Sequence, residues 1–78
     1  MKTQKLIRLT ANEVNSFVNL ASGCDFDIDI ANQGYERRTI DAKSYLGIMS
    51  LDLNKPLLIT CHGENNDMFV FLSEHACM

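Results

Sequence analysis

The segment at residues 24–30, CDFDIDI, constrains the fold most, because apolar and acidic side chains alternate along its whole length. Successive side chains of a β-strand point to opposite faces of a sheet. One face of this segment is therefore apolar, formed by Cys24, Phe26, Ile28 and Ile30, and the other carries aspartates. The pattern predicts a half-buried strand in a sheet that is covered on one face only.

A helix is predicted just before this strand, at residues 12–23. Its apolar residues recur at the i, i+3, i+4 and i+7 positions of a helical stripe, at Val14, Phe17, Val18 and Ala21. Thr10 or Asn12 can cap its start, and Gly23 can end it. A helix with one apolar stripe packs on a flat apolar surface, so we expect it to cover the strand at residues 24–30 and to share its core.

The other elements follow from short apolar runs and turn signals. Strands are expected at residues 5–9, 35–40 and 57–62, with the turn ANQG joining 24–30 to 35–40 as a hairpin. A short helix capped by Asp41 is expected at 42–51, and a helix started by Asn or Asp in the tail 63–78. The order β-α-β-β-α-β-α predicts a single α+β domain over residues 1–78. This is an open-faced sandwich, with a four-stranded antiparallel sheet and helices on one face.

Composition excludes several classes of function. With 78 residues and a net charge of −3, the chain offers no basic surface for nucleic acid or anionic membranes. Three cysteines without a C-x-x-C pair, and no apolar leader or span, predict a reduced, cytoplasmic protein.

No motif indicates a metal or catalytic site. The acidic spacing at 25–29 lacks the glycine and glutamate of a calcium loop, and Cys61 and His62 face opposite ways on a strand. We expect Cys24 and Cys61 to act as small core residues, and we expect no catalytic group, metal or cofactor.

The segment at residues 42–51, AKSYLGIMSL, resembles the second-helix signature of HPr. HPr is the histidine-containing phosphocarrier of the bacterial phosphoenolpyruvate:sugar phosphotransferase system, and the element order is similar across nearly the whole chain. The resemblance implies that Ser44 is a regulatory phosphorylation site. It also implies that Tyr45, Leu46 and Met49 dock onto partner proteins of the phosphotransferase system or of catabolite regulation.

The chain departs from this family at the carrier site. The phosphoryl-carrying histidine of HPr precedes the first helix in a pattern like G-x-H-x-R-P, whereas this chain has TANE at residues 10–13. A phosphothreonine at Thr10 would be a stable ester and a poor phosphoryl donor. The loss of the active histidine resembles Crh, an HPr relative of catabolite regulation. Residues 34–44 also look longer, and the terminal helix shorter, than in the family.

The resemblance therefore favours a non-enzymatic protein-binding domain without the carrier site. Two other functions remain open: a phosphocarrier that uses His62 or His75, and a diverged domain that assembles with itself. The docking residues also have a structural alternative. Ser44 can be an ordinary first-turn residue, and the short helix can bury part of its apolar set. Of that set, we expect Ile48 and Leu51 to lie in the core.

Overall fold

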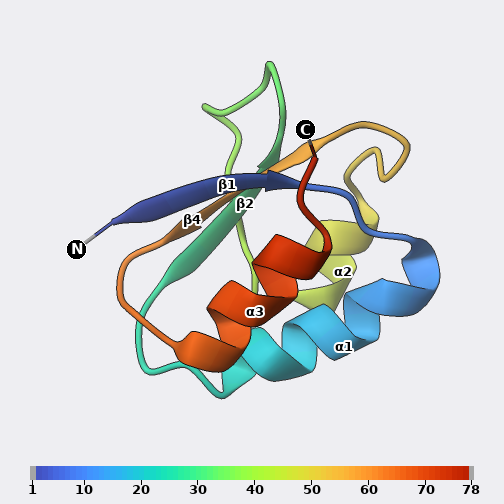
Figure 1. Ribbon diagram of the computed structural model, residues 1–78. Helices are drawn as coiled ribbons and strands as arrows, with labels where there is room; N and C mark the ends of the chain where they lie inside the picture. Colours follow the sequence, from blue (N-terminus) through green and yellow to red (C-terminus); the bar gives the residue numbers. More distant parts are fainter. Residues whose placement is uncertain (1, 78) are drawn as a thin grey trace.

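The computed structural model describes residues 2–77 and confirms the α+β open-faced sandwich. The strands are β1 (Thr3–Ile7), β2 (Ile28–Asn32), β3 (Ile40–Asp41) and β4 (Leu57–Cys61). The helices are α1 (Ala11–Ser22), α2 (Tyr45–Met49) and α3 (Asn66–Glu74). Figure 1 shows α1 and α3 side by side over one face of the sheet, with α2 near the N-terminal end of α1. Among residues 2–77, no helix is long and apolar enough to cross a bilayer.

The sheet has the order β1-β4-β2-β3, and every neighbouring pair is antiparallel. The last strand in the chain therefore lies between the first two. Ile59 of β4 is opposite Lys5 of β1 on one side and Ile30 of β2 on the other. This register brings the C-terminal ends of β1 and β2 and the start of β4 to one end of the sheet.

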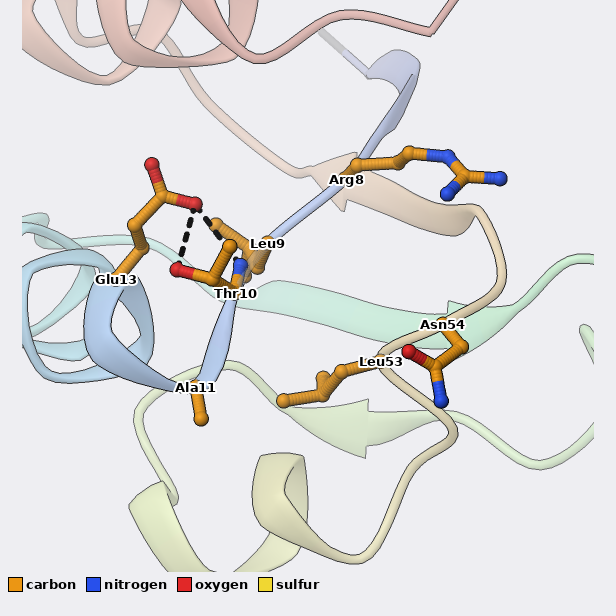
Figure 2. Close-up of a pocket in the computed structure, with 7 residues that line it drawn as sticks. All are labelled: Arg8, Leu9, Thr10, Ala11, Glu13, Leu53 and Asn54. Atoms are coloured by element: carbon orange, nitrogen blue, oxygen red, sulfur yellow. Dashed lines mark hydrogen bonds between the residues drawn. The ribbon is translucent and has the colours of Figure 1, made fainter.

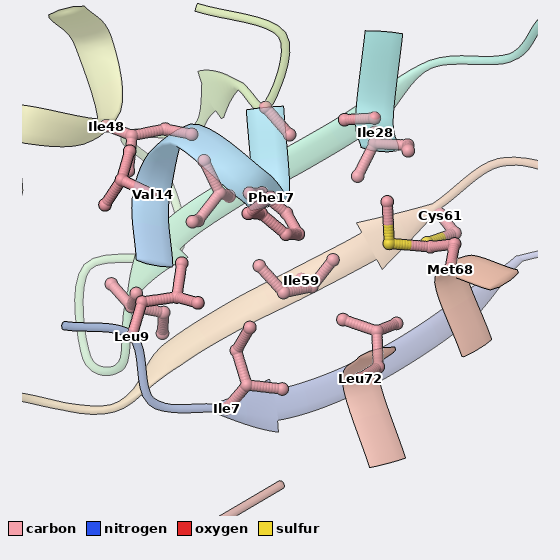
Figure 3. Packing of buried hydrophobic residues seen from close by; sticks show 14 of the residues in the cluster. Ile7, Leu9, Val14, Phe17, Ile28, Ile48, Ile59, Cys61, Met68 and Leu72 are labelled. Carbon is pink, nitrogen blue, oxygen red and sulfur yellow. The ribbon is translucent and has the colours of Figure 1, made fainter. Parts of the chain in front are cut away.

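A single apolar core lies between the sheet and the helices (Figure 3). Four of the predicted core residues are fully buried: Val14 and Phe17 on α1, and Ile28 and Ile30 on β2. The remaining predicted core residues fall into two groups. Ala21, Cys24, Cys61 and Ile48 are also buried, whereas Val18, Phe26 and Leu51 are partly buried and pack against the core. The apolar stripe of α1 and the alternation of β2 thus meet as predicted.

Three predicted strands have other bounds in the structure. The strand predicted at residues 5–9 is β1, which ends at Ile7 because Ile7 is opposite Leu57, the first residue of β4. The strand predicted at residues 24–30 begins only at Ile28, because Ile28 pairs with Cys61, the last residue of β4, and earlier residues have no strand opposite them. The strand predicted at residues 35–40 is reduced to Ile40 and Asp41. Its first part forms turns instead, with the N–H of Tyr35 donating to Asn32 O and that of Arg38 to Tyr35 O.

The cap of α2 also differs from the prediction. Ser44, and not Asp41, is the N-cap, and its Oγ accepts a hydrogen bond from Gly47 N–H at 3.2 Å. The carboxylate of Asp41 accepts instead from the N–H of Lys43. Gly47 allows α2 to lie close to β3, because a Cβ at this position would be 2.6 Å from Cγ2 of Ile40. The helix is therefore shorter than predicted and begins directly after the serine.

A substitution at Phe17 tests the packing of this core. Its ring is fully buried and lies 5.6 Å from the ring of Phe71, measured between centroids. Replacing it by alanine removes the largest core side chain and leaves a cavity, so Phe17→Ala should lower the free energy of unfolding by about 3–5 kcal/mol. Urea denaturation followed by circular dichroism measures this change, and an unchanged midpoint would contradict the inward orientation of this α1 face.

Candidate functional site

The three predicted docking residues are exposed on α2. Leu46 is 80% exposed, Tyr45 43% and Met49 38%, whereas Ile48 of the same helix is fully buried. A helix of five residues has room for one inward anchor, so its other bulky side chains must face solvent. The structure therefore places Tyr45, Leu46 and Met49 on one short element, directly after the exposed Ser44. We call Tyr45, Leu46 and Met49 the α2 patch.

Ser44 has a structural role in this site. Its side chain satisfies the N–H of Gly47, one of the backbone donors that the start of a helix leaves free. Its own backbone N–H donates to Asp41 O at 2.9 Å. Any group added to the hydroxyl would therefore lie at the N-terminus of α2, beside the α2 patch.

An open hollow of about 410 Å³ lies where β1 leads into α1. Figure 2 shows Thr10 and Glu13 joined on one side of it, Arg8 extending away from them, and Leu53 and Asn54 on the other side. Leu53 and Asn54 follow α2, so α2 and the hollow lie on neighbouring parts of the molecule. This is the strand-to-helix connection in which the sequence lacks a histidine.

Glu13 links the start of α1 to the end of α3. One carboxylate oxygen accepts hydrogen bonds from the N–H and the hydroxyl of Thr10, at 2.8 and 3.1 Å. The other oxygen lies 2.8 Å from Nε2 of His75. The hydrogen bond from Thr10 N–H is the main cause that lowers the pKa of the Glu13 carboxyl, and His75 adds to it. Glu13 is thus held as a carboxylate between these two residues.

His75 has hydrogen-bond acceptors at both ring nitrogens. Nδ1 lies 2.8 Å from the carbonyl oxygen of Phe71, and Nε2 lies beside Glu13. A neutral imidazole has one N–H, so only the doubly protonated ring donates to both acceptors. Burial by itself lowers the pKa of His75, but the hydrogen bonds to Phe71 and Glu13 together outweigh it and raise the pKa. In this arrangement neither nitrogen presents a free lone pair to a phosphoryl group.

His62 lies elsewhere, on the sheet face that the helices leave open. It follows β4, and its Nε2 is 2.9 Å from Oδ2 of Asp29 on β2. Its ring is 42% exposed. The structure therefore keeps the two histidines apart. His75 lies against the connection between β1 and α1, where its ring contacts Glu13 and its backbone oxygen accepts from the N–H of Arg8, whereas His62 lies on the open face of the sheet.

The cysteines are free thiols. Burial raises the pKa of Cys61 to about 11 and also raises that of Cys24, so both remain protonated near neutral pH. Across residues 2–77, no group of three metal-binding side chains is found. These thiols therefore contribute packing to the core.

Sequence reasoning missed the ion pair between Glu13 and His75, because these residues are 62 positions apart. It also missed the bonds between Thr10 and Glu13, although a signal for them exists. T-A-N-E at residues 10–13 has the spacing of a capping box, in which the acidic residue accepts from the N–H of the cap. Leu53 and Asn54 carry no comparable signal, and only the fold brings them to the hollow.

The raised pKa of His75 predicts a pH dependence of stability. A raised folded-state pKa stabilises the fold fully below the unfolded pKa of about 6.5, and this contribution is lost as pH rises through the folded pKa. We expect the stability advantage of the wild type over His75→Gln to be larger at pH 6 than at pH 9. Urea denaturation at both pH values measures it.

NMR titration of the imidazole gives an independent check on the same ion pair. We expect the His75 resonances to titrate above the ordinary value of about 6.5 in the wild type. The control is Glu13→Gln, in which this pKa should fall. A pH-independent stability difference together with an unshifted titration would show that the ion pair does not form.

Comparisons with known proteins agree with this architecture. A family model described as "PTS HPr component phosphorylation site" matches residues 8–70. The fold is similar to the crystal structure of a phosphocarrier protein HPr from Bacillus anthracis str. Ames, with a TM-score of 0.73 and 28% sequence identity. The match covers 97% of this chain and 98% of that one. No curated protein matches the chain.

Proposed function

The chain belongs to the family of HPr components of the phosphotransferase system, because the family model spans most of its length, and from this we propose that it is a non-carrying, protein-binding member. It would dock onto phosphotransferase-system or catabolite-regulation proteins of the cytoplasm through the α2 patch. The observation that carries this proposal is the exposure of Tyr45, Leu46 and Met49 on a helix whose Ile48 is fully buried. Contiguous exposed apolar side chains on a small domain are typical of protein-binding surfaces.

The residues around Thr10 favour a non-carrying role. Carrier function needs a nucleophile that forms a labile phosphoryl bond, such as the phosphoramidate of a histidine. The connection between β1 and α1 offers the hydroxyl of Thr10, which donates to Glu13. A phosphate ester there would be stable and would lie beside a carboxylate, which repels it.

A carrier role for a relocated histidine is the competing hypothesis. The contacts of His75 speak against it, because both ring nitrogens face acceptors. His62 is more accessible, and it is the better candidate if transfer survives. Incubation with phosphoenolpyruvate and the first enzyme of the phosphotransferase system distinguishes the carrier role from the non-carrying role. We expect no acid-labile phosphate by mass spectrometry, and a stoichiometric phosphate lost in His62→Ala would establish the carrier role instead.

If the α2 patch is a docking surface, charged substitutions in it should weaken partner binding and leave the stability of the fold nearly unchanged. Leu46→Glu and Met49→Glu should change the free energy of unfolding by no more than about 0.5 kcal/mol, because exposed side chains contribute little to it. Each should weaken a complex by about tenfold or more, since apolar anchors concentrate binding energy. The measurements are urea denaturation and quantitative pull-down from the native cell extract with the whole chain as bait.

Val70→Glu is the matched control for these variants. Val70 is 49% exposed on α3, so the substitution introduces the same charge on another apolar surface. The proposal requires Val70→Glu to retain the partners that Leu46→Glu loses. Unfolding of both α2 variants would show that the patch belongs to the core. Capture of further copies of the chain as the main bound protein, confirmed by analytical ultracentrifugation, would instead identify a self-assembling domain.

Ser44 is the proposed regulatory phosphorylation site of this surface. Because its side chain caps α2, Ser44→Ala should lose about 1 kcal/mol of stability, and it cannot by itself isolate the effect of charge. Asparagine and aspartate both cap helices well, and they differ in charge. Ser44→Asn and Ser44→Asp should therefore be equally stable. A difference in partner binding between them would measure the effect of a negative charge next to the patch, and equal binding would argue against regulation at this position.

A further inference from the structure

The loop between β2 and β3 carries a second exposed cluster, which α2 docking does not use. Residues 35–38 are Tyr, Glu, Arg and Arg, and all four side chains are exposed. Tyr35 is 62% exposed, more than any other large aromatic residue among residues 2–77. Arg37 and Arg38 are two of the seven basic residues of the chain. We call Tyr35, Arg37 and Arg38 the hairpin cluster.

The base of this loop is anchored by hydrogen bonds to the segment between α2 and β4. Its base is held by Asn32, whose side chain donates to Asp52 O at 2.8 Å and accepts from Asp52 N–H at 3.0 Å. The N–H of Gln33 donates to Pro56 O, and Gly34 supplies the turn with a φ of +91°. None of these contacts uses the side chains of the hairpin cluster. The loop therefore presents them on a preformed backbone.

Both guanidinium groups are available for a ligand. Within residues 2–77, neither Arg37 nor Arg38 forms an ion pair, and the side-chain hydrogen bonds there include none from either residue. The one acidic side chain of the loop, Glu36, is turned back to accept from the N–H of Gly34. An open hollow of about 500 Å³ also lies at this loop, and residues 34–38 line it. Tyr35, Arg37 and Arg38 thus line one recess, and all three side chains are exposed.

We propose that the hairpin cluster binds an acidic segment of a protein partner. Arginine forms paired hydrogen bonds to carboxylates, and tyrosine adds contact area with little loss of side-chain entropy. Nucleic acids and anionic membranes fit less well. Binding to their phosphates depends on many cationic contacts, whereas the cluster has two arginines in a chain with a net charge of −3. The inference does not rest on the α2 patch or on the proposed role of Ser44.

The test is titration of the ¹⁵N-labelled whole chain with an oligoglutamate peptide at low ionic strength, followed by NMR. We expect saturable shifts in the amides of residues 34–38. Arg37→Glu and Arg38→Glu should each weaken binding about tenfold. Tyr35→Ala should also weaken it, whereas Tyr35→Phe should retain it. Thermal denaturation of each variant checks that the fold is unchanged.

Two controls make the test specific. Lys5→Glu introduces the same change of charge on β1, outside the loop, and should leave affinity within about twofold of the wild type. Leu46→Glu should also bind the peptide normally, which separates this cluster from α2 docking. Three results would each overturn the proposal: no saturable shift at residues 34–38, an equal loss of affinity in Lys5→Glu, or equally tight binding of oligothymidylate.

Discussion

The fold depends on the pairing of β4 with both β1 and β2. These two strands have no contact with each other in the sheet, and β4 supplies five opposed residues to each of them. The same strand contributes Leu57, Ile59 and Cys61 to the core that α1 and α3 cover. The sheet is therefore complete only when a segment near the end of the sequence enters between two earlier ones. Such non-local pairing makes folding slower than in a protein of mainly local contacts.

The sequence predicted the layers of this fold better than the ends of its strands. Alternation correctly identified Ile28 and Ile30 as inward residues, because the period of two follows from the strand itself. The start of β2 is fixed by its partner, since β4 ends at Cys61, and alternation within residues 24–30 contains no information about that partner. The predicted antiparallel pairing of the hairpin is confirmed, but the length of its second strand was wrong for a related reason. Residues 35–38 satisfy their backbone locally in turns, which leaves β3 two residues long.

For the candidate site too, some features could be predicted from the sequence and others could not. The exposure of Leu46 was predictable, because a helix of one and a half turns cannot bury every bulky residue that it carries. The role of Ser44 as the cap was missed, since Asp41 is an equally good capping residue and only the backbone geometry distinguishes them. The hydrogen bond between Glu13 and His75 could not be predicted from the sequence, because it depends on where α3 ends relative to α1. The sequence thus predicted which side chains α2 exposes, but not which residue caps it or which distant elements meet.

The segment after α3 has a consequence for how the molecule behaves at high concentration. Ala76 forms a bridge with Ile7, the N–H of Cys77 donates to Leu6 O, and the N–H of Arg8 donates to His75 O. These contacts occupy the outer side of the last part of β1, where an unpaired strand edge would otherwise accept a strand from another molecule. The opposite edge of the sheet, β3, is only two residues long and offers little to pair with. At the last part of β1 and at the short β3, this open sheet of four strands is therefore protected against pairing with a strand of another molecule.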